Sequence, residues 1–358
     1  MRSRRHLGLR KRWALHLFSK LYADTVTEHR LHTLFWECTL RCNLSCRHCG
    51  SDCRVDPEMP DMPLADFLRV LDEEVTPHVN PAEVLIIFSG GEVLMRSDLE
   101  EAGREVSRRG YPWGMVTNGM ALTAERLERL IDAGLQSISV SLDGFAPEHN
   151  RLRGHALSYE RALQAIRCIV KHPELAFDVI TCATGDLIPQ LKAFRELLKA
   201  EGVQHWRLFS IFPMGRARND ASLQTSDEQF RTLLEFIRRT RREGGIDVSY
   251  ACEGFLGGYE AEVRDYFYQC AAGVSVASIR VNGDISGCTS VRANYTQGNI
   301  YRDRFWEVWS ERFKPFRDRS WARRDACADC KMFRYCLGGG MHLHDDDGRL
   351  LYCHYQRL

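Results

Sequence analysis

The chain has 358 residues, more than one ordinary hydrophobic core covers, so we expect one large domain with a smaller one, or an enlarged barrel. Its 44% hydrophobic and 27% charged residues exclude a disordered or collagen-like chain. The 49 basic and 48 acidic residues give a net charge of +1, so nothing points to nucleic acid as the main partner. No apolar run approaches the roughly 20 residues that a bilayer requires. We therefore expect a soluble, cytoplasmic protein.

Strand and helix patterns alternate along the first two thirds of the chain. The predicted strands are 34–38, 83–88, 114–117, 136–142, 177–181 and 205–209. The helices predicted between them are 63–75, 98–109, 123–131, 158–171, 188–200 and 227–242. Because crossovers between parallel strands are right-handed, six such units predict an α/β fold with a parallel sheet curled into a partial (β/α)6 TIM-like barrel. The loops after the strands would then form the working face.

The fourth predicted strand suggests what the barrel holds. Ser137, Ser139 and Ser141 alternate with aliphatic residues, and side chains alternate between the two faces of a strand. Aliphatic side chains would face the outer helices, so the serines would line the lumen and indicate a bound polar molecule. A half-exposed antiparallel strand is the alternative, which the flanking strand–helix pattern disfavours.

The sequence changes character near residues 245–250. Helical periodicity weakens there, and 275–281 and 284–286 read as a hairpin around Gly283. We therefore divide the chain into an N-terminal segment 1–30, a barrel 31–247 and a C-terminal domain 248–358.

The N-terminal segment contains eight basic and two acidic residues. Ala14, Leu17, Phe18 and Leu21 recur at helical spacing, which predicts a basic amphipathic helix. Docking on the barrel is the favoured interpretation. Peripheral contact with an anionic membrane surface, or binding of an acidic peptide, remains open.

Most of the fourteen cysteines are clustered, which in a chain without a recognisable signal peptide favours metal ligands over disulfides. Cys42, Cys46 and Cys49 form a C-x3-C-x2-C pattern directly after the first strand. Three such thiolates can hold three corners of a [4Fe–4S] cube and leave the fourth iron open to a chelating ligand. The alternative is a zinc knuckle, in which Cys38 or Cys53 would supply the fourth ligand.

This pattern resembles the signature of the radical S-adenosylmethionine (SAM) enzymes, and further matches follow in order over about residues 34–217. They are Gly90-Gly91-Glu92, Thr117-Asn118-Gly119, the S-x-D-G pattern of Ser141 to Gly144, and the P-x-G-R-A turn of Pro213 to Ala217. The resemblance implies that Cys42, Cys46 and Cys49 hold the cluster and that Glu92 meets the amino group of SAM. The full SAM site that it implies is His48, Gly90, Gly91, Glu92, Asn118, Ser139, Ser141, Asp143, Arg153 and Pro213.

The C-terminal part resembles the SPASM extension, or the shorter twitch extension, of radical SAM enzymes that modify peptides. The resemblance implies an auxiliary [4Fe–4S] cluster on Cys327, Cys330, Cys336 and Cys353, for which a zinc ribbon is the alternative. Gly340 stands where the family usually has a further cysteine. A third cluster on Cys270 and Cys288 would thus lack a ligand, with Cys252, His342 and His344 as candidates to replace it.

The resemblance implies SAM cleavage to a 5′-deoxyadenosyl radical, with electrons from a flavodoxin or ferredoxin. Residues 35–39, 115–122 and 327–343 are similar to radical SAM proteins encoded beside small lipoproteins, which implies peptide, protein or lipoprotein modification. The resemblance assigns no catalytic base. Anaerobic sulfatase-maturing enzymes share the architecture, but they place an aspartate where this chain has Thr289. A non-catalytic zinc-binding protein is the other rival.

Overall fold

A computed structural model describes residues 7–358 and contains one continuous curved sheet within them. The strand order is β10-β9-β8-β1-β2-β3-β4-β5-β6-β7, parallel from β8 to β7, with β9 and β10 antiparallel. The strands are β1 Thr33–Thr39, β2 Leu85–Gly90, β3 Trp113–Thr117, β4 Leu135–Ser141, β5 Ala176–Ala183, β6 His205–Ser210, β7 Asp247–Tyr250, β8 Val276–Ile279, β9 Asp284–Ser286 and β10 Gly298–Asn299.

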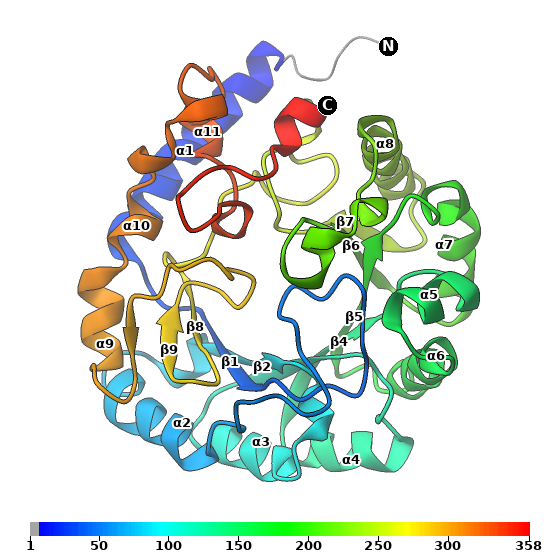
Figure 1. Cartoon of the computed structure of the whole chain (residues 1–358), viewed down its shortest axis with the longest axis vertical. Coiled ribbons are helices and arrows are strands. Elements are labelled where there is room, and N and C mark those ends of the chain that lie inside the picture. Colours follow the sequence, from blue (N-terminus) through cyan, green and yellow to red (C-terminus); the bar gives the residue numbers. More distant parts are fainter. Residues whose placement is uncertain (1–6) are drawn as a thin grey trace.

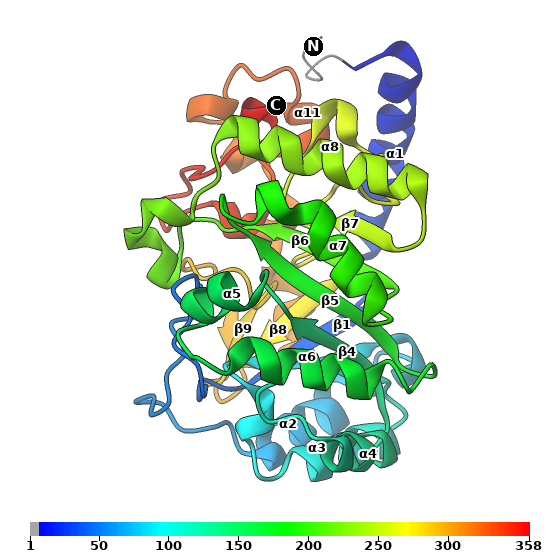
Figure 2. The same ribbon diagram turned by 90° about the vertical axis from the view of Figure 1, so that its right-hand side faces the viewer.

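Helices cover the outside of the curved sheet (Figures 1 and 2). Within residues 7–358 they are α1 Leu9–Glu28, α2 Leu64–Val70, α3 Leu99–Arg108, α4 Ala124–Asp132, α5 Ala146–Arg153, α6 Ser158–Ile169, α7 Leu191–Ala200, α8 Asp227–Glu243, α9 Phe305–Glu307, α10 Lys314–Arg317 and α11 Phe333–Cys336. Single turns of 3₁₀ helix and two π-helical turns, Leu71–Val75 and Val308–Arg312, connect them.

The predicted partial (β/α)6 barrel is confirmed, because each of the six predicted strands is observed and is followed by its helix. Local signals fixed the helix starts. The Thr123 hydroxyl accepts a hydrogen bond from the Arg126 amide at the start of α4, and Ser226 forms a capping box with Gln229 at the start of α8. Helix α5 was not predicted.

Aromatic packing fixes the sheet to its outer helices below the working face. Trp36 of β1 stacks on Phe67 of α2 with ring centroids 4.4 Å apart, and it meets Phe88 of β2 edge-on. Phe88 in turn stacks on Trp113 of β3 at 4.8 Å. These rings are fully buried, so the carboxyl ends of β1, β2 and β3 are held at fixed positions.

The sheet continues across the division predicted at 247/248. Strand β7 lies at that position and pairs with β6, while β8 pairs in parallel with β1. The hairpin predicted around Gly283 is confirmed as β8 and β9, with Gly283 at φ +85°. The division into 1–30, 31–247 and 248–358 stays a prediction, with the C-terminal part joined to the barrel by strand pairing.

Helix α1 forms as predicted, but the predicted apolar stripe is wrong. Ala14 and Phe18 face the protein, whereas Leu17 and Leu21 are exposed. Residues 1–6 of the predicted basic segment lie outside the described residues. No helix within residues 7–358 has the length and hydropathy needed to cross a membrane.

Candidate functional site

The loop after β1 brings Cys42, Cys46 and Cys49 together. A backbone bridge closes it, with the Cys42 amide donating to the Arg54 carbonyl at 2.7 Å and the Arg54 amide donating to the Leu40 carbonyl at 3.2 Å. Cys42 and Cys46 are buried in one small cluster with Leu44, against which Cys49 packs. The structure thus places all three sequence-predicted thiols at one site, at the carboxyl end of β1.

The turn after β6 braces this loop, a long-range contact that no local sequence pattern predicted. Gly215 has φ +55°, and a Cβ there would lie 2.4 Å from the Cys49 carbonyl oxygen, so only glycine permits this approach. The Arg216 amide donates to the Cys49 carbonyl at 3.0 Å. The Arg216 guanidinium donates to the Cys46 carbonyl at 2.7 Å and to the Cys53 carbonyl at 3.0 Å. The P-x-G-R-A turn is therefore a clamp on the cysteine loop.

The pKa values of the three thiols differ. Burial raises the pKa of Cys42 to about 11. Burial also raises the pKa of Cys46, although Arg153, with its Nη1 3.9 Å from the sulfur, opposes this. A hydrogen bond with Cys53 lowers the pKa of Cys49 to about 5. Metal ions bind cysteine as the thiolate, and the metal–sulfur bonds offset the free energy needed to ionise buried thiols. This set of donors therefore fits a metal centre.

Sulfur spacing distinguishes a cluster from a single ion. Four thiolates around one zinc ion at 2.3 Å lie about 3.8 Å apart. Within residues 7–358, the single set of three candidate ligand atoms that all fall within 4.8 Å is His48, Asp143 and Cys182. Within residues 7–358, no three sulfurs of the predicted cysteine sets all lie within 4.8 Å of one another, so none of these sets has the spacing of a single zinc ion.

Cys38 and Cys53 occupy different environments. Cys38 belongs to the main hydrophobic core, and its sulfur meets the Ser89 carbonyl at 3.4 Å. It is thus separate from the loop thiols. Cys53 shares the small cluster of the loop and forms a hydrogen bond with Cys49. Of the two thiols named for the zinc-knuckle alternative, Cys53 thus lies beside the loop thiols and Cys38 does not.

The Gly90-Gly91-Glu92 segment brings the end of β2 against the cysteine loop. A Cβ at Gly90 would lie 2.0 Å from the Thr39 carbonyl oxygen, and one at Gly91 would lie 2.2 Å from that of Arg41. Glu92 is fully buried. Its carboxylate accepts hydrogen bonds from the Leu94 amide at 3.1 Å, the Thr117 hydroxyl at 2.7 Å and the Asn118 amide at 2.7 Å.

These three bonds make Glu92 the link between the segments after β2 and β3. A carboxylate offers about four acceptor positions, so about one remains for a ligand. Binding of the SAM amino group by Glu92 stays a prediction. Asn118 extends the link, because its side-chain amide donates to Asn43 at 2.8 Å and lies 3.9 Å from the Cys42 sulfur.

Asp143, after β4, is the centre of a buried charged group. Its carboxylate accepts from Arg153 at 2.6 Å and from the Cys182 amide at 2.8 Å, and the His48 Nε2 lies 3.8 Å away. Burial alone would raise the pKa of Asp143, but the positive charge of Arg153 brings it down to about 2. Burial lowers the pKa of His48 to about 4. The structure thus gathers three predicted SAM residues beside Cys46, and adds Cys182.

Ser139, the middle one of the three predicted lumen serines, faces polar partners. Ser139 donates to Asp178 at 2.6 Å and accepts from Arg207 at 3.0 Å, while Ile138 and Val140 are buried in the core on the other face. Ser141 is buried one step closer to the strand end. Pro213, half-buried, follows Phe212, whose ring lies 4.8 Å from that of His342. Direct contacts of these residues with SAM remain predictions.

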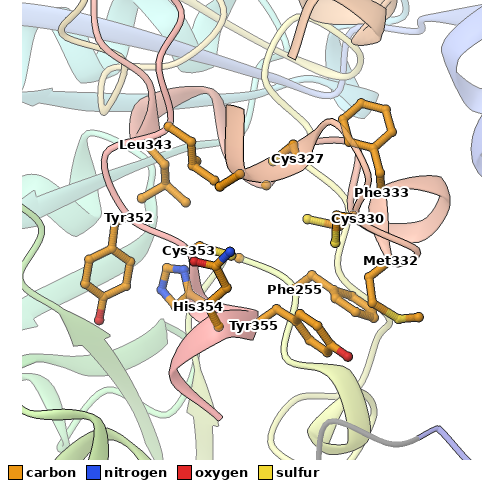
Figure 3. A pocket seen from close by; sticks show the side chains of 17 residues that line it. Phe255, Cys327, Cys330, Met332, Phe333, Leu343, Tyr352, Cys353, His354 and Tyr355 are labelled. Atoms are coloured by element: carbon orange, nitrogen blue, oxygen red, sulfur yellow. The ribbon is translucent and has the colours of Figure 1, made fainter. Parts of the chain in front are cut away.

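The four C-terminal cysteines predicted for an auxiliary cluster line one hollow (Figure 3). Cys327, Cys330 and Cys353 surround it in the figure, and Cys336 completes the set. Burial, followed by the charges of Cys353 and Cys330, raises the pKa of Cys327 to about 11. The backbone bends around the hollow through three consecutive positive φ angles, at Leu337, Gly338 and Gly339. Four buried or half-buried thiols in one hollow fit a fully protein-bound cluster.

The three thiols suggested for a third cluster also come near one another. Cys252 is exposed, whereas Cys270 and Cys288 are half-buried, and the charges of Cys288 and Cys270 both act on Cys252. Gly340 leaves no room for the usual cysteine, because a Cβ there would lie 2.5 Å from the His342 ring and 3.0 Å from the Tyr268 hydroxyl. His342 and Tyr268 thus fill the space of the missing side chain.

Comparison with protein families agrees with this geometry. The radical SAM superfamily matches residues 36–198, and the SPASM domain, an iron–sulfur cluster-binding domain, matches residues 270–331. The first match covers the cysteine loop and the segments after β2, β3 and β4. The second begins at Cys270 and includes Cys288, Cys327 and Cys330.

Curated relatives span most of the chain. An AdoMet-dependent heme synthase of Oleidesulfovibrio alaskensis is 27% identical over 326 residues, covering 85% of this chain and 81% of the relative. The mycofactocin maturase MftC of Mycolicibacterium smegmatis is 28% identical over 322 residues, covering 86% and 77%.

Solved structures share the fold. The structure of anSMEcpe with bound AdoMet has a TM-score of 0.72 at 17% identity, covering 92% of this chain and 94% of the other. Streptococcus suis SuiB bound to its precursor peptide SuiA has a TM-score of 0.69 at 17% identity, covering 89% and 75%.

Proposed function

Because this chain is a radical SAM enzyme with a SPASM domain, we propose that it abstracts hydrogen from a peptide or protein substrate, as the first step of a post-translational modification. The observation that carries the proposal is the pair of thiol sites on one side of the barrel. Cys42, Cys46 and Cys49 lie at the end of β1, and His354, next to Cys353, lies 3.0 Å from the Tyr250 hydroxyl at the end of β7. A substrate over the barrel would thus lie between them.

We assign the SAM cluster to Cys42, Cys46 and Cys49, and the auxiliary cluster to Cys327, Cys330, Cys336 and Cys353. A [4Fe–4S] cluster held by the first three cysteines would supply the electron for reductive cleavage of bound SAM to methionine and a 5′-deoxyadenosyl radical. The role of this chain's own residues is to hold and orient the segments that form the site. Arg216 and Gly215 fix the loop, while Glu92 fixes the segment after β3 against it. Buried Asp143 and Arg153 keep a paired charge beside the loop, a fixed polar environment for SAM.

Peptide or lipoprotein modification is supported by the relationship to mycofactocin maturase and by the shared fold with SuiB bound to its precursor peptide. A flavodoxin or ferredoxin would be the electron donor. For the sulfatase-maturing alternative, Thr289 follows Cys288 in place of the aspartate, and the threonine hydroxyl is a poor base near neutral pH.

A tetrapyrrole is the second candidate substrate. It is favoured by the heme synthase relatives, which include a second protein, from Methanosarcina barkeri, 26% identical over 90% of this chain. The two candidates predict different hydrogen donors, so isotope transfer separates them.

The test is performed on anaerobically reconstituted protein with SAM and dithionite. One arm contains a deuterated peptide of a small lipoprotein precursor, the substrate class that the resemblance implies, and the other a deuterated iron coproporphyrin. Deuterium in 5′-deoxyadenosine from the peptide supports the proposal, with Cys46→Ala as the blank. Deuterium from the tetrapyrrole alone would contradict it and support the second candidate.

A further inference from the structure

Helix α1 carries a ridge of exposed apolar side chains. Leu9, Trp13, Leu17 and Leu21 have exposed fractions of 76%, 68%, 58% and 64%. They recur every four residues, so they follow one another along the same side of the helix. At 1.5 Å per residue, the ridge is about 18 Å long. Large apolar side chains that gather on one surface mark an interaction site more often than isolated ones do.

The opposite face of α1 already holds the helix to the protein. Leu15 is buried in a cluster with Phe255 and Tyr335, and Phe18 packs against Phe267 with ring centroids 5.6 Å apart. The Tyr22 hydroxyl donates to the Cys270 carbonyl at 2.9 Å. The ridge is therefore not needed for docking the helix, and it remains in water.

Positive charge flanks the ridge. Arg10, Arg12 and Lys20 are exposed and form no ion pair within residues 7–358. By contrast, Lys11 points inward and pairs with Glu262 at 2.9 Å. No acidic residue occurs between positions 7 and 23. The exposed face thus combines apolar bulk with unpaired cations, the composition of helices that lie in an anionic membrane interface.

We propose that the outer face of α1 docks on an anionic lipid surface, with Trp13 and the three leucines at the level of the headgroups. Helix α1 lies at the edge of the molecule (Figure 2), and the four side chains of the ridge are exposed on it. Such a ridge fits a deformable planar surface, whereas a peptide is normally held in a groove. A second copy would bring the same unpaired cations against one another, which is unfavourable. A lipid surface that carries phosphate charges pairs with them instead.

Vesicle sedimentation tests this docking with the reconstituted full chain. We expect binding to phosphatidylcholine vesicles that contain phosphatidylglycerol and much weaker binding to phosphatidylcholine alone. Leu17→Ser with Leu21→Ser should weaken binding about tenfold or more, and each of Arg10→Gln, Arg12→Gln and Lys20→Gln about fivefold at low salt. The matched control combines Leu157→Ser, Arg104→Gln and Lys192→Gln, all exposed on other helices or loops, and should bind like the parent protein.

The fluorescence of Trp13 provides a second readout, which reports the environment of the ridge itself. Its emission should shift to the blue on addition of anionic vesicles, and this shift should be absent in Trp13→Phe. Equal SAM cleavage in all variants shows that they are folded. The proposal is overturned if the parent protein ignores anionic vesicles, if the ridge variants bind as well as the control, or if the ridge instead mediates dimerisation in sedimentation equilibrium without lipid.

Discussion

Replacing Arg216 with alanine should loosen the loop that carries Cys42, Cys46 and Cys49, the three thiols proposed to hold the SAM cluster. The change removes side-chain hydrogen bonds to the Cys46 carbonyl at 2.7 Å, to Asp52 at 2.8 Å and to the Cys53 carbonyl at 3.0 Å. A hydrogen bond from a charged donor contributes about 1.5–3 kcal/mol when it is buried. Because the Arg216 side chain is 27% exposed, water replaces part of the free energy that these hydrogen bonds contribute. We therefore take about 1.5–3 kcal/mol for the three hydrogen bonds together.

This free energy corresponds to about 10- to 150-fold faster loss of iron to a ferrous chelator under anaerobic conditions. Arg218 is the matched control, because it lies in the same turn, is exposed and, among residues 7–358, reaches only the Met214 sulfur at 3.9 Å. Arg218→Ala should therefore release iron at the parent rate, and Arg216→Lys should fall between the two alanine variants, since lysine keeps the charge without the planar fork. Equal rates of iron loss from Arg216→Ala and Arg218→Ala would show that the Arg216 side chain does not hold the cysteine loop in place.

Three further predictions concern the other parts of the site. Glu92→Gln should weaken SAM binding about 10- to 150-fold in calorimetry, because the amide disrupts the donor set of Thr117 and Asn118 and removes the charge that we propose faces the SAM ammonium. An unchanged dissociation constant would leave Glu92 with a purely structural role. Reconstituted protein should hold about eight irons per chain, and about four in a variant without Cys42, Cys46 and Cys49, because Gly340 leaves the third site short of a ligand. About eight irons in that variant would show a third stable cluster. Gly340→Cys should add iron only together with His342→Ala, which removes the collision between the new side chain and the His342 ring. The pKa of Asp143 is lowered to about 2 from its usual 3.8, so its ion pair with Arg153 stabilises the fold above about pH 4. This stabilisation is lost as the pH falls toward 2. Urea unfolding of the metal-free protein should show that loss, whereas urea unfolding of Asp143→Asn should not.

Local sequence signals predicted the barrel well because they act within one element. Alternation in β4 predicted Ser139 on the inner face, and Thr123 predicted the start of α4. The thiol motif likewise lies in a single loop, so its spacing alone placed Cys42, Cys46 and Cys49 together.

Contacts between distant segments were not predictable in the same way. Strand β8 pairs with β1 although some 240 residues separate them, and the hydrogen bond between Arg216 and Cys46 spans 170 residues. Helix α1 shows a different limit, because it has apolar residues on two sides. The pattern combined Phe18 from the packed side with Leu17 from the exposed side, and only the position of the C-terminal part, on which α1 packs, distinguishes them.

The most direct test of the account is SAM cleavage in single alanine variants of the loop cysteines. Each reconstituted variant is reduced with dithionite, and 5′-deoxyadenosine is measured by mass spectrometry. We predict that Cys42→Ala, Cys46→Ala and Cys49→Ala form none above background, whereas Cys38→Ala and Cys53→Ala retain activity. Full activity in Cys46→Ala would contradict the assignment of the cluster, and with it the proposed chemistry of the site.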